Sequence, residues 1–301
     1  MRGINLSRCM LVMIVLLLPL HAFGAEEIRF KHESSLYADE KGVGLNQPEG
    51  VACSNDRLAV ADTGNGRLVL FTLQGGEFKG GTEIRLSQVL YPIRIVRNSS
   101  GDLFVLDGKQ RKVARLSADG SFKQYVELSG LPVEGMVIPA GISLDGNGLL
   151  YLLDIQGSRV LVFTDDGKYQ RQIVLPKDYG FIADLAVNSK GTVFLLDSVH
   201  AMVYSTAKDP AVFLPVTERL KDDMTFPSNI IVDDKGLMYI SDQNNGNIVV
   251  VNQDGTIRRL FSTGWKEGAL RYPTQLCINS NGDLFVADRA NSRIQKFIPL
   301  K

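Results

Sequence analysis

The sequence predicts an all-β fold built from six copies of one unit, and three observations carry this prediction. First, an aspartate closes an apolar run six times, at intervals of 45, 47, 43, 45 and 46 residues. These aspartates are Asp62, Asp107, Asp154, Asp197, Asp242 and Asp288. Second, the runs are rich in aromatic and β-branched residues and are bounded by glycine and aspartate, which is typical of strands. Third, a fixed period of this length indicates a repeat architecture.

Each unit follows one plan of four strands. The run that ends at the aspartate is preceded by another strand, which is usually opened by a proline, at positions 48, 92, 139, 227 and 273. In the fourth unit Ile182 stands in register with these prolines. A third and a fourth strand follow, and Asp-Gly pairs join them at 119–120, 166–167 and 254–255. Asp-Gly between apolar strands is a strong hairpin signal, because type I′ turns need positive φ at both central residues.

Six four-stranded antiparallel sheets that are buried on both faces predict a six-bladed β-propeller. The blades are expected near residues 47–86, 91–127, 138–175, 182–214, 226–261 and 272–299. The sixth unit stops after its third strand, whereas an unassigned alternating strand occupies residues 27–32. We predict that this strand completes the last blade, because an open ring would expose two large apolar blade faces. No helix is required in residues 26–301.

Residues 1–25 are set apart from the fold. Arg2 and Arg8 precede an apolar stretch at 10–20, and small residues at 22–25 precede a charged segment. This layout predicts a cleavable signal peptide, with an uncleaved anchor as the alternative. We therefore expect a single periplasmic or secreted domain over residues 26–301, with no membrane span. Its net charge is −2, because cleavage removes two of 33 basic residues and none of 33 acidic ones. Such a chain lacks the basic footprint of a nucleic-acid-binding protein.

Residues 273–297 closely resemble an NHL repeat. They read PTQLCINSNGDLFVADRANSRIQKF, with Asp288 followed five residues later by Arg293. Residues 48–71 resemble the repeat nearly as well, and the third unit is also a good match. The fourth unit is degenerate, with Met202 in place of the arginine. The resemblance covers essentially all of residues 26–301 and implies a six-bladed propeller. Most such propellers are recognition platforms and a few are metal-dependent enzymes, so the fold does not settle the function.

The six repeated aspartates are interpreted as structural residues. An aspartate at a strand end can accept hydrogen bonds from turn amides, and an arginine five residues later can lie against it. That arginine is present as Arg67, Arg159 and Arg293. An active site needs one constellation of groups, whereas these aspartates are six equivalent copies around a ring.

The chain contains few of the side chains and motifs that usually form catalytic or metal sites. Beyond residue 25 its histidines are His32 and His200, which excludes a three-histidine zinc site. The turns at 145–148 and 233–236 resemble calcium loops but lack their spaced carboxylates and terminal glutamate. The chain contains no nucleophile elbow and no phosphate-binding glycine loop. We expect no cofactor, although a lactonase-like calcium site of carboxylates and asparagines stays open as an alternative.

Cys53 and Cys277 are predicted on the innermost strands of the first and last blades, which are neighbours in the ring. Cys53 follows Pro48 by five residues and Cys277 follows Pro273 by four, so their parities are opposite. Side chains that face each other across a blade interface have this relation, and so do side chains that face away. A disulfide needs Cα atoms within about 7 Å, which stacked sheets rarely allow. Two free thiols are therefore favoured over a bridge.

One end of the predicted propeller carries loops of variable length and content. These are the second-to-third strand turns and the connections between blades, whereas the turns at the other end are short and stereotyped. Function usually resides in variable loops on a rigid scaffold. The connections contain Tyr37, Glu134, Tyr179, Phe181, Arg219, Trp265, Lys266, Arg271 and Tyr272. Trp265 is interpreted either as a contact anchor or as a lid over its own blade.

The inner strands present a second group of candidates at the channel mouth. Two residues after the proline position they carry Gly50, Arg94, Gly141, Asp184, Asn229 and Gln275, where the family usually has glycine. Such converging polar groups fit a small polar ligand or a peptide tip. Alternatively, Arg94 and Asp184 pair across the channel and plug it. The candidate ligand-binding residues are therefore Arg94, Asp184, Asn229, Gln275, Trp265 and Tyr272.

These observations predict a monomeric, non-catalytic recognition or scaffold protein. It would bind a protein, peptide or glycan of the cell envelope through the variable loops and the channel mouth. The alternatives are a metal-dependent lactonase- or lyase-like enzyme and a structural part of a larger envelope complex.

Overall fold

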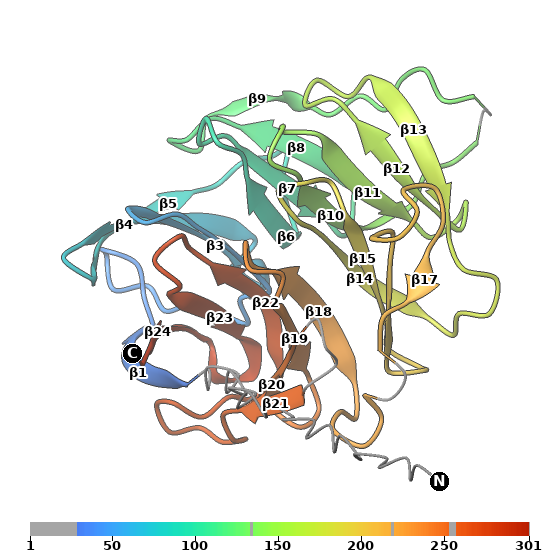
Figure 1. The fold of residues 1–301 in the computed structure, drawn as a ribbon. Helices are drawn as coiled ribbons and strands as arrows, with labels where there is room; N and C mark the ends of the chain where they lie inside the picture. The colour runs from blue at the N-terminus through green and yellow to red at the C-terminus, as the bar shows by residue number, and fades with distance from the viewer. Residues whose placement is uncertain (1–28, 133–134, 218–219, 253–256, 301) are drawn as a thin grey trace, which may run out of the picture.

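The computed structural model describes residues 29–132, 135–217, 220–252 and 257–300. The predicted signal peptide at 1–25, the first part of the predicted closing strand, the turn at 254–255, Glu134 and Arg219 lie outside these ranges. The described residues form six four-stranded antiparallel sheets around a common axis (Figure 1). The predicted six-bladed β-propeller is confirmed.

The blades follow one another along the chain, each from its innermost to its outermost strand. Blade 1 contains β2 (Gly50–Cys53), β3 (Arg57–Asp62), β4 (Arg67–Gln74) and β5 (Glu77–Ile84). Blade 2 contains β6 (Pro92–Arg97), β7 (Leu103–Asp107), β8 (Lys112–Leu116) and β9 (Phe122–Tyr125). Blade 3 contains β10 (Pro139–Leu144), β11 (Leu150–Asp154), β12 (Arg159–Phe163) and β13 (Tyr169–Val174).

The second half of the ring repeats this plan. Blade 4 contains β14 (Ile182–Val187), β15 (Val193–Asp197), β16 (Met202–Ser205) and the short β17 (Leu214–Pro215). Blade 5 contains β18 (Pro227–Val232), β19 (Met238–Asp242), β20 (Asn247–Val251) and β21 (Ile257–Leu260). Blade 6 contains β22 (Pro273–Ile278), β23 (Leu284–Asp288), β24 (Arg293–Pro299) and, from the N-terminal side, β1 (Phe30–Leu36). Two single-turn 3₁₀ helices, η1 (Thr63–Asn65) and η2 (Arg289–Asn291), follow β3 and β23.

The N-terminal strand closes the ring. β1 pairs antiparallel with β24, with Phe30 opposite Pro299 and Leu36 opposite Ile294 (Figure 1). The last blade therefore draws strands from both ends of the described chain, as the sequence predicted. Opening the ring here would expose the faces of blades 1 and 6 to water, which is unfavourable in proportion to the apolar area exposed.

The hydrophobic core is divided among the interfaces between blades. Between blades 6 and 1, for example, Val60 and Val69 pack in one cluster with Phe285 and Ile294. The second strand of every blade has its last five residues buried, because both of its faces meet a neighbouring blade. Burying such side chains contributes about 1.5–3 kcal/mol each. The ring is thus held together by the contacts between neighbouring blades.

The propeller has two chemically different ends. Because successive strands run antiparallel, the second-to-third strand turns and the blade connections share one end, which we call the loop face. The first-to-second and third-to-fourth strand turns share the other end, which we call the turn face. Within the described residues no helix has the length and apolarity needed to cross a membrane.

Candidate functional site

Each repeated aspartate pins a loop-face connection to its own blade. In blade 2, the Asp107 carboxylate accepts hydrogen bonds from the backbone N–H groups of Leu90 and Tyr91, which lead into β6, at 2.7 and 2.9 Å. It also accepts from the N–H groups of Lys109 and Gln110 in the following turn, at 2.8 and 2.7 Å. Burial opposes ionisation of Asp107, but these four donors outweigh it and hold the pKa of the carboxyl below its usual value.

In blades 1, 3 and 6 an arginine also pairs with the repeated aspartate, and the arginines of blades 1 and 6 are the more deeply buried. Arg67 is 1% exposed and donates from Nε to Asp62 at 2.7 Å and from Nη1 to Asp39 at 2.6 Å. Arg293 donates from Nε to Asp288 at 2.8 Å and from Nη2 to the carbonyl oxygens of Lys266 and Ala269, both at 2.8 Å. Each arginine thus ties a blade connection to a buried carboxylate. This geometry supports the structural interpretation of the repeated aspartates.

The four polar residues on the inner strands meet across the channel and form what we call the polar belt. Asp184 accepts a hydrogen bond from Asn229 Nδ2 and one from the N–H of Ile230 at 3.1 Å. Asn229 Oδ1 accepts from the N–H of Leu276 at 2.8 Å. The belt therefore links the inner strands of blades 4, 5 and 6.

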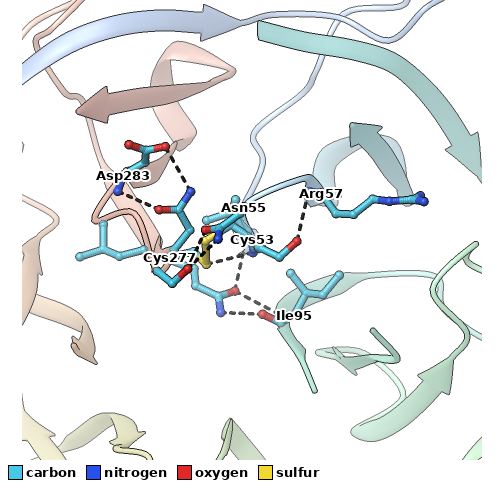
Figure 2. The surroundings of a disulfide bond; sticks show 12 residues. Cys53, Asn55, Arg57, Ile95, Cys277 and Asp283 are labelled. Atoms are coloured by element: carbon cyan, nitrogen blue, oxygen red, sulfur yellow. Dashed lines mark hydrogen bonds between the residues drawn. A yellow bond between two sulfur atoms is a disulfide. The ribbon is translucent and has the colours of Figure 1, made fainter. Parts of the chain in front are cut away.

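Gln275 continues the polar belt to blades 1 and 2. Its Oε1 accepts from the N–H of Ile95 at 3.0 Å, and its Nε2 donates to the carbonyl of Ile95 at 2.8 Å (Figure 2). This bridge passes over Gly50, where a Cβ would lie 3.1 Å from Gln275 Oε1. The same Cβ would lie 2.9 Å from Cβ of Ala61, so a side chain at position 50 would displace its neighbours. Arg94 Nε lies 3.9 Å from Asp184 Oδ1, so an ion pair between these two side chains completes the belt. The interpretation of these groups as a plug is supported.

A cavity of about 250 Å³ lies in the channel beside the polar belt. Its lining residues all stand at or after the belt position in their inner strands, and many are the last residues of those strands, such as Arg97, Val187 and Val232. Because inner strands run from the loop face to the turn face, the cavity occupies the turn-face half of the channel. The belt residues, which were expected at the channel mouth, border this cavity.

Cys53 and Cys277 form a disulfide in the wall of this cavity, with their Cα atoms 6.0 Å apart (Figure 2). The expectation of two free thiols is therefore wrong. Sheets that stack face to face lie about 10 Å apart, but propeller blades converge toward the axis. The inner strands β2 and β22 are close enough there for a bridge, which links the first and last blades 224 residues apart.

The loop face carries most of the exposed large hydrophobic side chains that the structure describes. On this face they are Tyr37, Val43, Leu90, Met136, Ile155, Phe181, Val199, Phe226, Trp265 and Tyr272. Several stand directly before an inner strand and so lie at the loop-face mouth of the channel. The residues at that position are Gln47, Tyr91, Ile138, Phe181, Phe226 and Tyr272. Four of these six are aromatic, which is a pattern that the sequence contains and that sequence reasoning missed in Tyr91 and Phe226.

Trp265 projects into solvent with 76% of its surface exposed, so it does not cover its own blade as a lid. The connection that bears Trp265 is anchored by hydrogen bonds from Arg293 and Tyr37. Arg293 binds the carbonyl of Lys266, and Tyr37 donates a hydrogen bond to Glu267 at 3.0 Å. This hydrogen bond, together with lesser contributions, lowers the pKa of Glu267. A large exposed indole on an anchored loop has the properties of a contact residue.

The described residues contain no group of three or more histidine, cysteine or acidic side chains that could hold a metal ion. His32 lies on the outer strand β1, where it contacts Phe297 and Ser35. His200 lies in the second-to-third strand turn of blade 4, where Nδ1 is 3.1 Å from Asp197. Neither histidine lines the channel cavity.

Comparison with known proteins identifies the repeat and the fold. Residues 270–297 match the model of the NHL repeat. A stretch of 130 residues is 32% identical to the protein brain tumor of Drosophila melanogaster and covers 41% of this chain but only 12% of that protein. The chain thus spans about an eighth of the length of this relative.

Solved structures of enzymes share the architecture. A gluconolactonase from Xanthomonas campestris aligns with a TM-score of 0.67 and 14% identity over 92% of this chain and 96% of that one. Virginiamycin B lyase from Staphylococcus aureus aligns with a TM-score of 0.61 and 14% identity over 90% and 99%. A catalytically inactive histidine-to-alanine variant of that lyase has been solved with quinupristin. At these identities the likeness shows the fold alone. The chain is a six-bladed β-propeller that carries an NHL repeat, identified at residues 270–297 in its last blade.

Proposed function

We propose that this protein is an exported, non-catalytic recognition propeller that binds a protein, peptide or glycan through its loop face. The observation that carries the proposal is the concentration of exposed apolar side chains on this face. Soluble proteins rarely expose contiguous apolar patches unless the patch serves an interaction. Aromatic side chains are enriched in interfaces because they bury much area at small entropic cost.

The loop face is also rigid enough to act as a preformed surface. The connections that bear Phe181 and Phe226 are pinned by Asp197 and Asp242, which accept from the N–H groups of those phenylalanines at 3.1 and 3.0 Å. Side chains on an anchored backbone lose less freedom on binding, which increases affinity.

Capture of a partner from cell-envelope extract tests the proposal, provided that a loop-face variant is compared with a matched control variant. The loop-face variant replaces Phe181 and Val199 by serine. The control replaces Val212 and Leu214, which are also exposed and lie in the third-to-fourth strand connection and at the start of β17 in blade 4. We expect the control to capture the same partner as the unmodified protein and the loop-face variant to lose it. Capture that survives the loop-face changes and fails in the control would place the interaction elsewhere. Mass spectrometry of the exported protein would test cleavage near residue 25.

The second candidate is a lactonase- or lyase-like enzyme, which the structural neighbours favour. Two features of the chain weigh against it. The described histidines do not line the channel cavity. The carboxylate and amide groups of the polar belt already accept hydrogen bonds from the backbone of neighbouring strands. Lactone hydrolysis by protein purified without chelators, together with elemental analysis, distinguishes the two candidates. Stoichiometric metal with turnover would favour the enzyme.

A further inference from the structure

The loop-face turn of blade 2 carries three exposed basic side chains, which we call the basic turn. They are Lys109, Arg111 and Lys112, between β7 and β8. Lys109 is the second residue after the repeated aspartate, where the other five blades have an uncharged residue. Lys112 is the fifth residue after it, where blades 1, 3 and 6 have the arginine that pairs with the aspartate. Blade 2 therefore departs from the other blades in this turn.

Arg111 has a backbone conformation that is occupied by small residues in the other blades. Its φ is 55°, in the left-handed region. The equivalent residues also have positive φ, and they are Gly66, Ser158, Ala201, Gly246 and Ser292. A long side chain is less favourable in this conformation than glycine. Non-glycine residues in such conformations cluster at functional sites, so this arginine indicates a role other than stabilising the turn.

The charges of the basic turn are not neutralised by acidic side chains. Among the residues that the structure describes, none forms an ion pair with the three cations. Lys109 Nζ lies 4.8 Å from the centre of the Tyr91 ring, and Lys112 Nζ lies 4.6 Å from that of Tyr125. Asp107 does not require these cations, because four backbone N–H groups already donate to its carboxylate. The basic turn is therefore available to an anionic partner.

A pocket of about 290 Å³ lies beside the basic turn, between blades 2 and 3. Arg111 and Lys112 line it, together with one acidic residue, Glu127. The accessible wall is mainly apolar and includes the half-buried Tyr125 and Leu128. The pocket lies at the loop face, because β8 and β10 begin at this end of their blades. Its volume is at the lower end of that of ligand pockets, which suits one large side chain rather than an extended acyl chain.

A partner that matches both features carries negative charge next to an apolar group. We propose that the basic turn and this pocket bind a protein segment in which acidic residues flank one large apolar side chain. The apolar side chain enters the pocket, and the flanking carboxylates pair with Arg111 and Lys112. The proposal rests on the loop-face function proposed above and specifies the chemistry of its partner. An uncharged glycan would leave the three cations unused.

Selection from a phage-displayed random-peptide library on the immobilised protein tests this site. We expect the enriched peptides to carry aspartate or glutamate beside leucine, phenylalanine or tyrosine. A synthetic, fluorescein-labelled peptide of the enriched sequence is then titrated by fluorescence anisotropy. The Lys109→Gln/Arg111→Gln/Lys112→Gln variant should bind it roughly tenfold more weakly, since each exposed ion pair contributes little by itself.

Two further variants separate binding from charge and from folding. Lys41→Gln/Lys177→Gln/Lys221→Gln removes the same charge from other exposed positions of the loop face and should bind the peptide normally. Arg111→Gly introduces the residue that blades 1 and 5 have at this position. It should weaken binding severalfold without lowering the melting temperature, because glycine adopts positive φ without strain.

Several results would overturn the assignment. These are the absence of enriched acidic and apolar peptides, equal losses of affinity in the two triple-glutamine variants, unchanged binding of a peptide whose apolar residue is replaced by serine, or tighter binding of single-stranded RNA or of phosphatidylglycerol vesicles. The Phe181→Ser/Val199→Ser variant changes blade 4 and should retain the peptide. If it loses the peptide while the basic-turn variant retains it, the loop-face function stands and the site proposed here is wrong.

Discussion

The two ends of this propeller differ in how their loops are anchored and in which side chains they expose. At the loop face, buried carboxylates take up the backbone donors of the connections, and apolar side chains such as Phe181 and Trp265 are left in solvent. At the turn face, most loops are short polar turns, apart from the connection at 206–213 in blade 4, and the cavity and the disulfide lie in the channel behind them. The loop face can therefore vary in sequence, because its anchoring is supplied by one aspartate per blade. The turn face instead contributes to closure of the ring.

The anchoring itself differs between blades. In blades 1 and 6, Arg67 and Arg293 join the aspartate to a connection, whereas Asp107 in blade 2 relies on four backbone N–H groups. In blade 3, Arg159 also contacts its aspartate, Asp154, at 2.9 Å, but its side chain is less buried than that of Arg67. The most deeply buried arginines thus lie in blades 1 and 6, where β1 completes the last blade.

The largest loss of stability is expected for Arg67→Met. Removing the guanidinium leaves Asp39 and Asp62 buried without their cation, and breaking such a pair costs about 3–5 kcal/mol. Arg159→Met is the matched control, because Arg159 contacts Asp154 but its side chain is 13% exposed against 0% for Arg67. Urea unfolding measures both. Equal losses for the two variants would contradict the argument that the deeper burial of Arg67 makes its ion pairs more important.

The disulfide at the turn face is expected to contribute somewhat less to the free energy of unfolding than Arg67 does. Replacing Cys53 and Cys277 by serine should lower the free energy of unfolding by about 2–5 kcal/mol, because the bridge constrains a long loop in the unfolded chain. Urea unfolding of the double variant gives this value. Thiol titration of the unfolded, unreduced protein should find the two cysteines unreactive. Two reactive thiols would show that the inner strands of blades 1 and 6 are not bridged.

A smaller and pH-dependent effect is expected for Asp107→Asn. The four backbone donors lower the pKa of Asp107 from 3.8, so its contribution is present above pH 4 and is lost as the pH falls through the lowered value. We expect a loss of about 1–3 kcal/mol at pH 7 that shrinks toward pH 3. Thermal unfolding across this range measures it. Asp234→Asn, in an exposed turn at the other end, serves as the control, and a loss independent of pH would contradict the argument.

The smallest effect on stability is expected for Phe181→Ser. The side chain is 50% exposed, and surface substitutions usually change stability by less than about 0.5 kcal/mol. Thermal unfolding should therefore be nearly unchanged while partner capture falls. A large loss of stability would show that Phe181 belongs to the packing of its blade rather than to a binding surface.

The sequence alone determined the number of blades, the strand order and the closure of the ring. These properties follow from local signals: an aspartate every 43 to 47 residues, Asp-Gly turns, and a spare strand near the N-terminus. Such signals depend on neighbours in the chain, so they are readable without coordinates. The same reading identified Arg94, Asp184, Asn229 and Gln275 as a set, because they share one position in the repeat.

Only the tertiary structure decided how these groups meet. The disulfide depends on the 6.0 Å between the Cα atoms of Cys53 and Cys277, and the polar belt depends on Gln275 reaching Ile95 across Gly50. The side of the belt on which the cavity lies, and the exposure of Trp265, also became visible only in three dimensions. The physical reason is that blades converge toward the axis. Distances between residues of different blades are set there by the closed ring, and no periodicity along the chain encodes them.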